Sequence, residues 1–392
     1  MMLRSYMIKL DTNKKQNKIL ANYFYEAKVL YNYVVSLPNA FLFDRKCRNI
    51  EKISENGENT PFTLTIPYAI RCEVVREIWN NIRRLHGKKM TGVKIGSLKH
   101  KRKIRSIPVY QPVGYVLTGK YVKIVGLTKQ AIRCFGTKQL HGKLHGAKLV
   151  QRPSGYYLFI SCEDSNTVHK ETKKDVGIDF GIKTDITLST GEKFIFRTEY
   201  SNSRRRLQRK LAKSVGSHSN RRGKLWDRLC RKYESAVNKK LDFVNKIVHM
   251  LDTKYDHIVW QDENIRGWMH SHMDGFFKRI YTGCQGKIKD MLNRKRIEEP
   301  DRFIQLGKYV PTTSVCTLCG HRQSNILKNR VYVCPCGYSE DRDVHAAKNM
   351  LIFAGLVQTK FKLPSDGGEV TPREKRSSTV ARKSTATCTS VN

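Results

Sequence analysis

The sequence predicts an α+β protein of several domains. A small antiparallel barrel carries a helical insertion, and a second αβ region carries a zinc-binding insertion. Three observations lead to this prediction. Six short strand-like segments follow one another between residues 107 and 161. Two long stretches, 14–36 and 202–250, have apolar residues at helical spacing. Two close pairs of cysteines stand near the C-terminal end, before a last amphipathic helix.

The composition favours a nucleic acid as the partner. Lysine and arginine number 74 against 34 aspartates and glutamates in 392 residues, a formal net charge of +40. A charge of this size repels itself unless a polyanion screens it. No apolar run approaches the roughly 18 residues of a membrane-spanning helix. The N-terminus lacks the long apolar region of a signal peptide. We therefore expect no membrane partner and a cytoplasmic, nucleoid-associated protein of a prokaryote or a mobile element.

The N-terminal third predicts a barrel that is interrupted by helices. A strand at 5–10 precedes two amphipathic helices, 14–36 and 66–85, whose charged outer faces suit a nucleic-acid duplex but also an ordinary solvated surface. A basic loop at 87–105 follows. The short strands after it are expected at 107–110, 115–117, 121–125, 132–134, 147–151 and 156–161. With the first strand they form a basic barrel or open sheet, and residues 14–88 form the insertion.

The apolar stretch 175–196 predicts two strands joined by a turn at Gly191 and Glu192, with Asp179 inside the first strand. A carboxylate within an apolar strand is costly unless a cation or hydrogen-bond donors meet it. The glycines on either side of Asp179 permit the close approach of a backbone or a metal. Asp179 is therefore a candidate metal ligand, with an aspartate on an edge strand as the alternative.

Basic helices dominate the middle of the chain. Residues 202–250 predict two helices separated by a Ser/Gly break at 214–219. Their many arginines and lysines favour contacts with phosphates over simple solvation. A buried strand at 255–260, a basic helix at 284–294 and a short strand at 303–306 follow.

Four cysteines form the most specific metal signature in the chain. Cys316 and Cys319 are spaced as Cys-x2-Cys, and Cys334 and Cys336 follow after a basic loop. Four thiolates at such spacing can close a tetrahedral zinc site, although the second pair is one residue tighter than usual. The remaining cysteines are scattered singly, and we interpret them as thiols rather than disulfides. We expect the zinc to be structural.

Acidic residues recur at three places in the second αβ region: Asp179, the segment 261–263 and Asp343. Asp343 lies in an acidic turn before an apolar helix that we expect to run to about residue 356. Carboxylates from distant parts of a chain suit two divalent cations, which activate water and stabilise the leaving oxygen in phosphodiester hydrolysis. Mg²⁺ is the expected ion because it prefers hard oxygen ligands.

Several motifs resemble a known family. GIDFG at 177–181, IVWQDENIRGW at 258–268, and CTLCG followed by CPCGYSEDRDVHAAKNM resemble the RuvC segments and zinc insertion of TnpB proteins. TnpB proteins are transposon-encoded, RNA-guided DNA nucleases related to the type V CRISPR effectors. The segments IKLDTNKKQNKIL and AKVLYNYVV look like the wedge strand and recognition helices of that family. The resemblance therefore covers most of the chain.

The resemblance implies a division of the chain. An RNase H-like (RuvC) nuclease domain would carry a zinc-ribbon-like insertion that binds target nucleic acid, and a wedge β-barrel with a helical recognition insertion would precede it. The expected ranges are 1–13 and 89–170 for the wedge barrel, 14–88 for the recognition insertion, 171–311 and 338–362 for the nuclease domain, 312–337 for the zinc insertion and 363–392 for a disordered tail.

The resemblance also implies an RNA-guided DNA endonuclease. A guide RNA would lie on the basic faces, and double-stranded target DNA would be recognised by pairing beside a short adjacent motif. Asp179 and Asp343 would be catalytic and would hold Mg²⁺. We add Glu263 as the third catalytic residue, because the family's second acidic position is changed in this chain. His345 stands where the family commonly has asparagine. It either orients Asp343 or the substrate, or is a polar cap.

One position departs from the family. Its second acidic residue aligns with Gln261, whose amide offers an oxygen without a charge. Three explanations are open. Glu263, on the same strand face, supplies the ligand; Glu298 or Glu299 moves in; or the protein is a nuclease-inactive, RNA-guided DNA-binding repressor. We favour an active nuclease that uses Glu263, because both aspartates of the site are present. A DNA-strand transferase is a further rival, although no tyrosine or serine has the setting of a covalent nucleophile.

Overall fold

The structure is a computed structural model. It describes residues 2–53, 59–110, 114–124, 126, 130–137, 140, 142–164, 171–197, 202–214, 219–270, 276–323, 330–359 and 361. The chain divides into two compact units. The first comprises Met1–Val168 and Trp226–Glu234, and the second His169–Leu225 and Ser235–Asn392. The predicted disordered tail, 363–392, lies outside the described residues.

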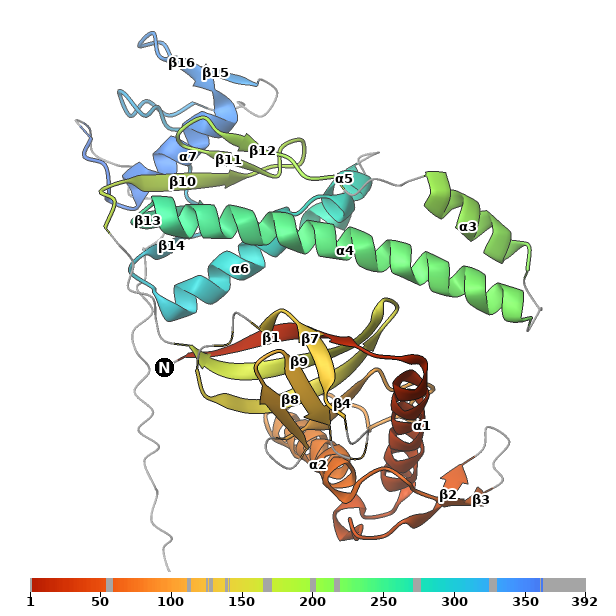
Figure 1. Cartoon of the computed structure of the whole chain (residues 1–392). Helices are drawn as coiled ribbons and strands as arrows, with labels where there is room; N and C mark the ends of the chain where they lie inside the picture. The colour runs from red at the N-terminus through yellow and green to blue at the C-terminus, as the bar shows by residue number, and fades with distance from the viewer. Residues whose placement is uncertain are drawn as a thin grey trace, which may run out of the picture. The chain divides into compact units, whose positions relative to one another are not determined.

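An antiparallel sheet of seven strands forms the framework of the first unit (Figure 1), in the order β4-β8-β9-β1-β7-β6-β5. The sheet curves so that its edge strand β5 approaches β8, near the opposite end of the strand order. There the hydroxyl of the buried Tyr115 donates a hydrogen bond to the carbonyl of His145 on β8 (2.8 Å). The sheet is therefore a nearly closed barrel, as the strand spacing predicts. The bounds are β1 Met2–Asp11, β4 Ser106–Val109, β5 Tyr115–Thr118, β6 Tyr121–Ile124, β7 Ile132–Phe135, β8 Leu144–Arg152 and β9 Gly155–Asp164.

Two helices are inserted after the first strand, α1 (Lys14–Ser36) and α2 (Tyr68–Met90). Both predicted helices are confirmed. A two-stranded hairpin, β2 (Asn49–Ile53) and β3 (Asn59–Thr63), lies between them and was not predicted. The buried carboxylate of Glu26 on α1 accepts hydrogen bonds from the backbone amides of Thr65 (2.6 Å) and Ile66 (2.8 Å). That carboxylate fixes the start of α2 against α1.

A mixed five-stranded sheet forms the framework of the second unit, in the order β12-β11-β10-β13-β14. The three strands β10, β13 and β14 run parallel, and β11 and β12 run antiparallel to their neighbours. The bounds are β10 Asp175–Phe180, β11 Ile186–Leu188, β12 Lys193–Phe194, β13 His257–Gln261 and β14 Phe303–Leu306. The sequence predicted two strands joined by the turn at Gly191, with Asp179 in the first, and this was wrong. Asp179 lies in β10, which ends at Phe180, and the turn at Gly191 joins the separate strands β11 and β12.

Helices cover both faces of this sheet (Figure 1). Alternate residues of β10 and β13 pack with the long helix α4 and with α6 in one apolar core. The opposite face, which includes Val259, packs against α7. The helix bounds are α3 Asn202–Ala212, α4 Asn220–Lys254, α5 Phe276–Thr282, α6 Gln285–Glu298 and α7 Arg342–Phe353. The break between α3 and α4 was predicted, and α5 was not. Among the described residues, no helix is both long and apolar enough to cross a membrane.

Candidate metal centres

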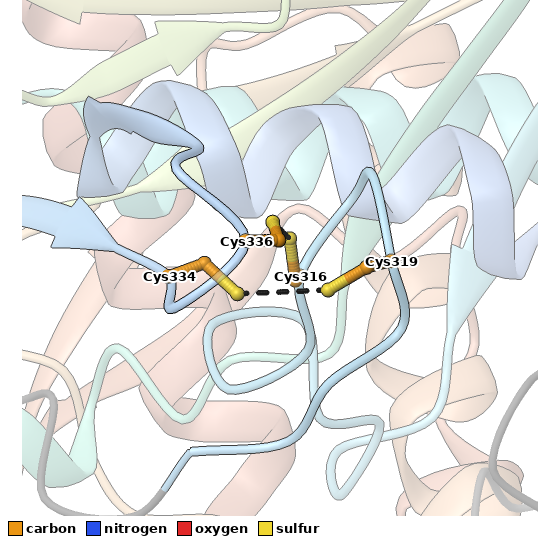
Figure 2. A group of neighbouring side chains, drawn as sticks. All are labelled: Cys316, Cys319, Cys334 and Cys336. Carbon is orange, nitrogen blue, oxygen red and sulfur yellow. Dashed lines mark hydrogen bonds between the residues drawn. The ribbon is translucent and has the colours of Figure 1, made fainter.

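The four cysteines converge on one point (Figure 2). The Sγ atoms of Cys316 and Cys336 lie 3.8 Å apart, and those of Cys319 and Cys334 lie 3.6 Å apart. All four sulfur atoms lie within 4.8 Å of one another. A disulfide would need about 2.05 Å, whereas a tetrahedron with Zn–S bonds of about 2.3 Å has edges of about 3.8 Å. The cluster therefore has the dimensions of a four-thiolate zinc site, and the tight second pair does not prevent it from closing.

The cysteine cluster is joined to α7 by aromatic packing. Its hairpin consists of β15 (Val331–Val333) and β16 (Ser339–Asp341), and β16 leads directly into α7. The ring of His345 on α7 stacks on Tyr332 of β15, with centroids 3.8 Å apart and planes 14° apart. Burial lowers the pKa of His345 to about 4. His345 is therefore a neutral, fully buried packing residue, and its partners include Tyr332, Tyr338 and Asn349.

Strand register puts Asp179 on the face of the sheet that α7 covers. Val176 and Ile178 belong to the core shared with α4 and α6, so Gly177 and Asp179 point to the other face. The backbone of α7 approaches Gly177 closely, since a Cβ there would lie 1.8 Å from the carbonyl oxygen of Ala347. Gly177 thus permits the close approach of a helix backbone. The sequence predicted that a backbone or a metal would lie close to this glycine.

Asp343 reaches the same region from the first turn of α7. Asp341 caps this helix, because its Oδ1 accepts from the backbone amides of Asp343 (3.1 Å) and Val344 (3.2 Å). The other oxygen of Asp341 pairs with Lys193 of β12 at 2.7 Å. The carboxylate of Asp343 is mostly shielded from solvent and lies 3.5 Å from Arg342 and 3.9 Å from Arg330. Asp341 is therefore a structural cap that fixes the first turn of α7, in which Asp343 lies.

The electrostatics of Asp179 connect the acidic residues. Burial, followed by the negative charges of Asp343 and Glu263, raises the pKa of Asp179 well above its ordinary value, while the positive charge of Arg342 acts in the opposite direction. Like charges that face each other in a partly desolvated place are unfavourable unless a cation joins them. The charges of Asp343 and Glu263 thus act on Asp179, and these are the three carboxylates that the sequence singled out. In the described part of the chain, the sulfur atoms of the four cysteines all lie within 4.8 Å of one another, and the oxygen atoms of the three carboxylates are more widely spaced.

Glu263 lies just beyond β13, in the wall of a polar hollow of about 520 Å³ whose other walls include Lys289 and Lys308. Burial, the largest cause, raises the pKa of Glu263, while the charges of Lys289 and Lys308 act in the opposite direction. Lys289 also pairs with Asp262 at 2.6 Å. These lysines could not be singled out from the sequence, where they are two among many basic residues.

The other glutamates considered for the site lie elsewhere. Glu298 is exposed at the C-terminal end of α6, and Glu299 pairs with Arg302 and, at 3.8 Å, with Lys295. Both glutamates precede Phe303, which pairs with Ile258 at the start of β13, whereas Asp179 and Glu263 belong to the other end of the parallel strands. Neither glutamate joins the carboxylates of Asp179 and Asp343.

Gln261 also faces α7, but its amide is turned into a protein loop. Its Nε2 donates to the backbone carbonyls of Gly307, Lys308 and Val310, and its Oε1 accepts from the hydroxyl of Thr312. Both polar atoms of the Gln261 amide are therefore engaged by the residues that follow β14.

Two family models match parts of the chain. Residues 286–350 match the TNB domain of Cas12f1-like proteins, and residues 159–271 match the probable transposase family OrfB_IS605. The first match contains all four cysteines and Asp343, and the second contains Asp179 and Glu263.

Two curated proteins are similar in sequence. A putative RNA-guided DNA endonuclease of Streptomyces pristinaespiralis is 28% identical over 209 residues, which is 52% of this chain and 51% of that protein. This match therefore spans only about half the length of that relative. A putative transposase, A625R, of Paramecium bursaria Chlorella virus 1 is 23% identical over 391 residues, covering 89% of this chain and 86% of the relative.

Solved structures show weaker likeness. A Cas12f1 solved by cryo-EM with sgRNA and target DNA is 14% identical and covers 89% of this chain and 99% of its own, with a TM-score of 0.27. A CRISPR-Cas12f ternary complex is 12% identical and covers 86% and 80%, with the same TM-score. A TM-score this low carries no conclusion about the arrangement of the chain.

Proposed function

Because this chain belongs to the TnpB family, we propose that it is an RNA-guided DNA endonuclease that hydrolyses phosphodiester bonds with divalent metal ions. The sheet order β12-β11-β10-β13-β14, with its three parallel strands, supports an RNase H-like (RuvC) core for the nuclease domain. The barrel of the first unit would be the wedge, and α1 and α2 the recognition insertion. For these domains we propose the boundaries that were expected from the sequence.

The observation that carries this proposal is the meeting of Asp179, Glu263 and Asp343. Burial and the two neighbouring negative charges raise the pKa of Asp179 well above its ordinary value. A cluster of like charges on two secondary-structure elements and the segment after a third is unfavourable by itself, and such a cluster is expected where a cation completes the site.

These carboxylates suit Mg²⁺, because hard oxygen ligands of several chain segments can share the ions with a substrate phosphate. We assign Asp179 and Asp343 as the Mg²⁺ ligands and Glu263 as the third catalytic carboxylate. Two bound ions would activate a water and stabilise the leaving oxygen. The chain's own groups hold the site in shape: the Asp341 cap orients the first turn of α7, and Lys289 offsets part of the charge beside Glu263.

The partners follow from charge and family. A formal net charge of +40 supports a guide RNA and double-stranded target DNA with a short adjacent motif. The four cysteines would hold a structural Zn²⁺ within an insertion that contacts the target. The protein would act in the cytoplasm, on the nucleoid or on mobile DNA.

A second candidate is a nuclease-inactive, RNA-guided DNA-binding repressor. The observation that favours it is Gln261, an uncharged residue at a position where the family has an acid. In this candidate the basic surfaces and the zinc insertion keep their roles, and the carboxylates do not cut.

The test is to purify the protein with the RNA that it carries from cells and to incubate it with matched plasmid and Mg²⁺. Linear product is the result expected for an endonuclease, and RNase treatment beforehand should abolish it. Salt-sensitive binding without any cut would reject the endonuclease in favour of the repressor. Joined or exchanged strands would reject both in favour of a strand transferase. An Asp179→Ala variant is the control for contaminating nucleases, since it should bind target and leave it intact.

A further inference from the structure

The side chain of Gln261 lies among backbone carbonyls. It is only 5% exposed. Its Nε2 donates to the carbonyl oxygens of Val310 (2.8 Å), Lys308 (3.0 Å) and Gly307 (3.3 Å). Its Oε1 accepts from the hydroxyl of Thr312 at 2.9 Å. Both polar atoms of the amide are therefore engaged with a single segment, residues 307–312, which we call the strap.

Three acceptors around one nitrogen require a donor at this position. A glutamate of the same length would put a carboxylate oxygen against the three carbonyls, with no proton to share and a charge to desolvate. The strap conformation therefore selects glutamine over glutamate. Gln261 therefore has a structural role that a glutamate at this position could not fill.

The hydrogen bonds continue from the strap to α7. The Nδ2 of Asn349, a fully buried residue of α7, donates to the carbonyls of Thr312 and Val315, both at 2.7 Å. Val315 directly precedes Cys316, the first cysteine of the cluster. The buried amides of Gln261 and Asn349 thus hold Thr312 from two sides. They connect the end of β13, the entry to the cysteine cluster and the helix that carries Asp343.

We propose that Gln261 is a positioning residue. It fastens the strap to the end of β13 and, through Thr312 and Asn349, sets the cysteine cluster and the first turn of α7 against that strand. Its effect on the placement of Asp343 rests on the proposed function, because it matters only if Asp343 is a metal ligand. Its effect on the cysteine cluster does not depend on any nuclease activity.

The test compares Gln261→Met with Gln305→Met in the full-length protein. Methionine keeps the length of glutamine and removes its hydrogen bonds. Gln305 is the matched control, because it lies on the neighbouring strand β14, pairs in register with Trp260 and bonds to Arg296 outside the strap. The measurement is the rate at which zinc passes from the protein to a colorimetric chelator, with circular dichroism as the check on folding.

We expect zinc release to be about tenfold faster from Gln261→Met, a factor that corresponds to one or two net hydrogen bonds. Gln305→Met should release zinc at the parent's rate. Thr312→Val should act in the same direction with a smaller factor, which keeps the test available if Gln261→Met does not fold. In Gln261→Met, adding Thr312→Val should change the rate less than it does in the parent, because the two side chains act on each other. Zinc release at the parent's rate from both single variants would overturn the proposal.

A second arm uses Gln261→Glu, which restores the acid of the family. If Gln261 positions the strap, this variant should release zinc faster than the parent and cut target DNA no faster. If Gln261 were only a lost ligand, the variant should cut faster, and that result would overturn the proposal. A parent that does not cut DNA would count against the proposed function, while the zinc-release arm would still decide the role of Gln261.

Discussion

Gly177 of β10 and Ala347 of α7 lie in direct backbone contact, so that a Cβ on the glycine would sit 1.8 Å from the carbonyl oxygen of Ala347. This contact allows α7 to pack closely against β10, the strand that carries Asp179. It is the packing relationship on which the meeting of Asp179 with Asp343 depends.

We predict that Gly177→Ala lowers the free energy of unfolding by about 3 kcal/mol, the upper end of the usual cost of overpacking, because backbone rather than a flexible side chain must move. Chemical denaturation checks this value. Gly223→Ala is the matched control: it lies on α4 with no atom within 4 Å of the added Cβ. The same change in a helix should stabilise by about 0.5 kcal/mol. Equal effects of the two substitutions would contradict the contact.

The cysteine cluster predicts one bound zinc per chain and a pattern of thiol reactivity. Removing the metal with a strong chelator should make the four cluster thiols reactive, with Cys336 fastest, because the backbone amide of Tyr338 lowers its pKa to about 7. Cys134 should stay unreactive, since burial raises its pKa to about 11. Thiol titration with and without chelator measures both. Unchanged reactivity of the cluster after chelation would argue against a zinc site.

An ion-pair cluster at the other end of the sheet predicts a pH dependence of stability. Burial alone would raise the pKa of Asp252, but Lys295 (2.9 Å) and Arg302 (3.2 Å) lower it below its ordinary value. The stability from this group is complete above about pH 4, the ordinary aspartate range, and is lost as the pH falls through the lower folded pKa.

Asp252→Asn should therefore cost about 2 kcal/mol at pH 7, and the difference from the parent should shrink below about pH 4. Urea denaturation across this range measures the difference. Asp242→Asn, which breaks an exposed pair with Lys246, is the control and should cost no more than about 0.5 kcal/mol. A difference for Asp252→Asn that is independent of pH would reject the ion-pair assignment.

Much of the fold could be predicted where local signals were strong. Helix α1 occupies 14–36 as predicted, and Asn13 and Gln16 form a capping box at its start. Strand β14 also has its predicted bounds. The β2–β3 hairpin was missed because its residues are mostly exposed and show no alternation, and its place depends on contacts such as that of Phe62 with Tyr25 of α1.

The candidate site, like the fold, could be predicted from the sequence only where the signal is local. Alternation along β10 is a local signal, so the face that carries Asp179 can be read from sequence. The role of Gln261 cannot, because it is set by the path of the strap, 46 to 51 residues farther along the chain. His345 likewise looked like a candidate for the chemistry until its stack on Tyr332 identified it as a packing residue.

The central claim, that Glu263 completes a site with Asp179 and Asp343, is tested most directly by the rate of target DNA cleavage by Glu263→Gln. This change keeps the size of the side chain and removes its charge. We expect cleavage to fall by at least about a hundredfold, as it should for Asp179→Asn, while target binding stays at the parent's level. Glu298→Gln, an exposed glutamate on α6, should cut at the parent's rate. If Glu263→Gln also cuts at the parent's rate while Asp179→Asn does not cut, Glu263 is not the third carboxylate.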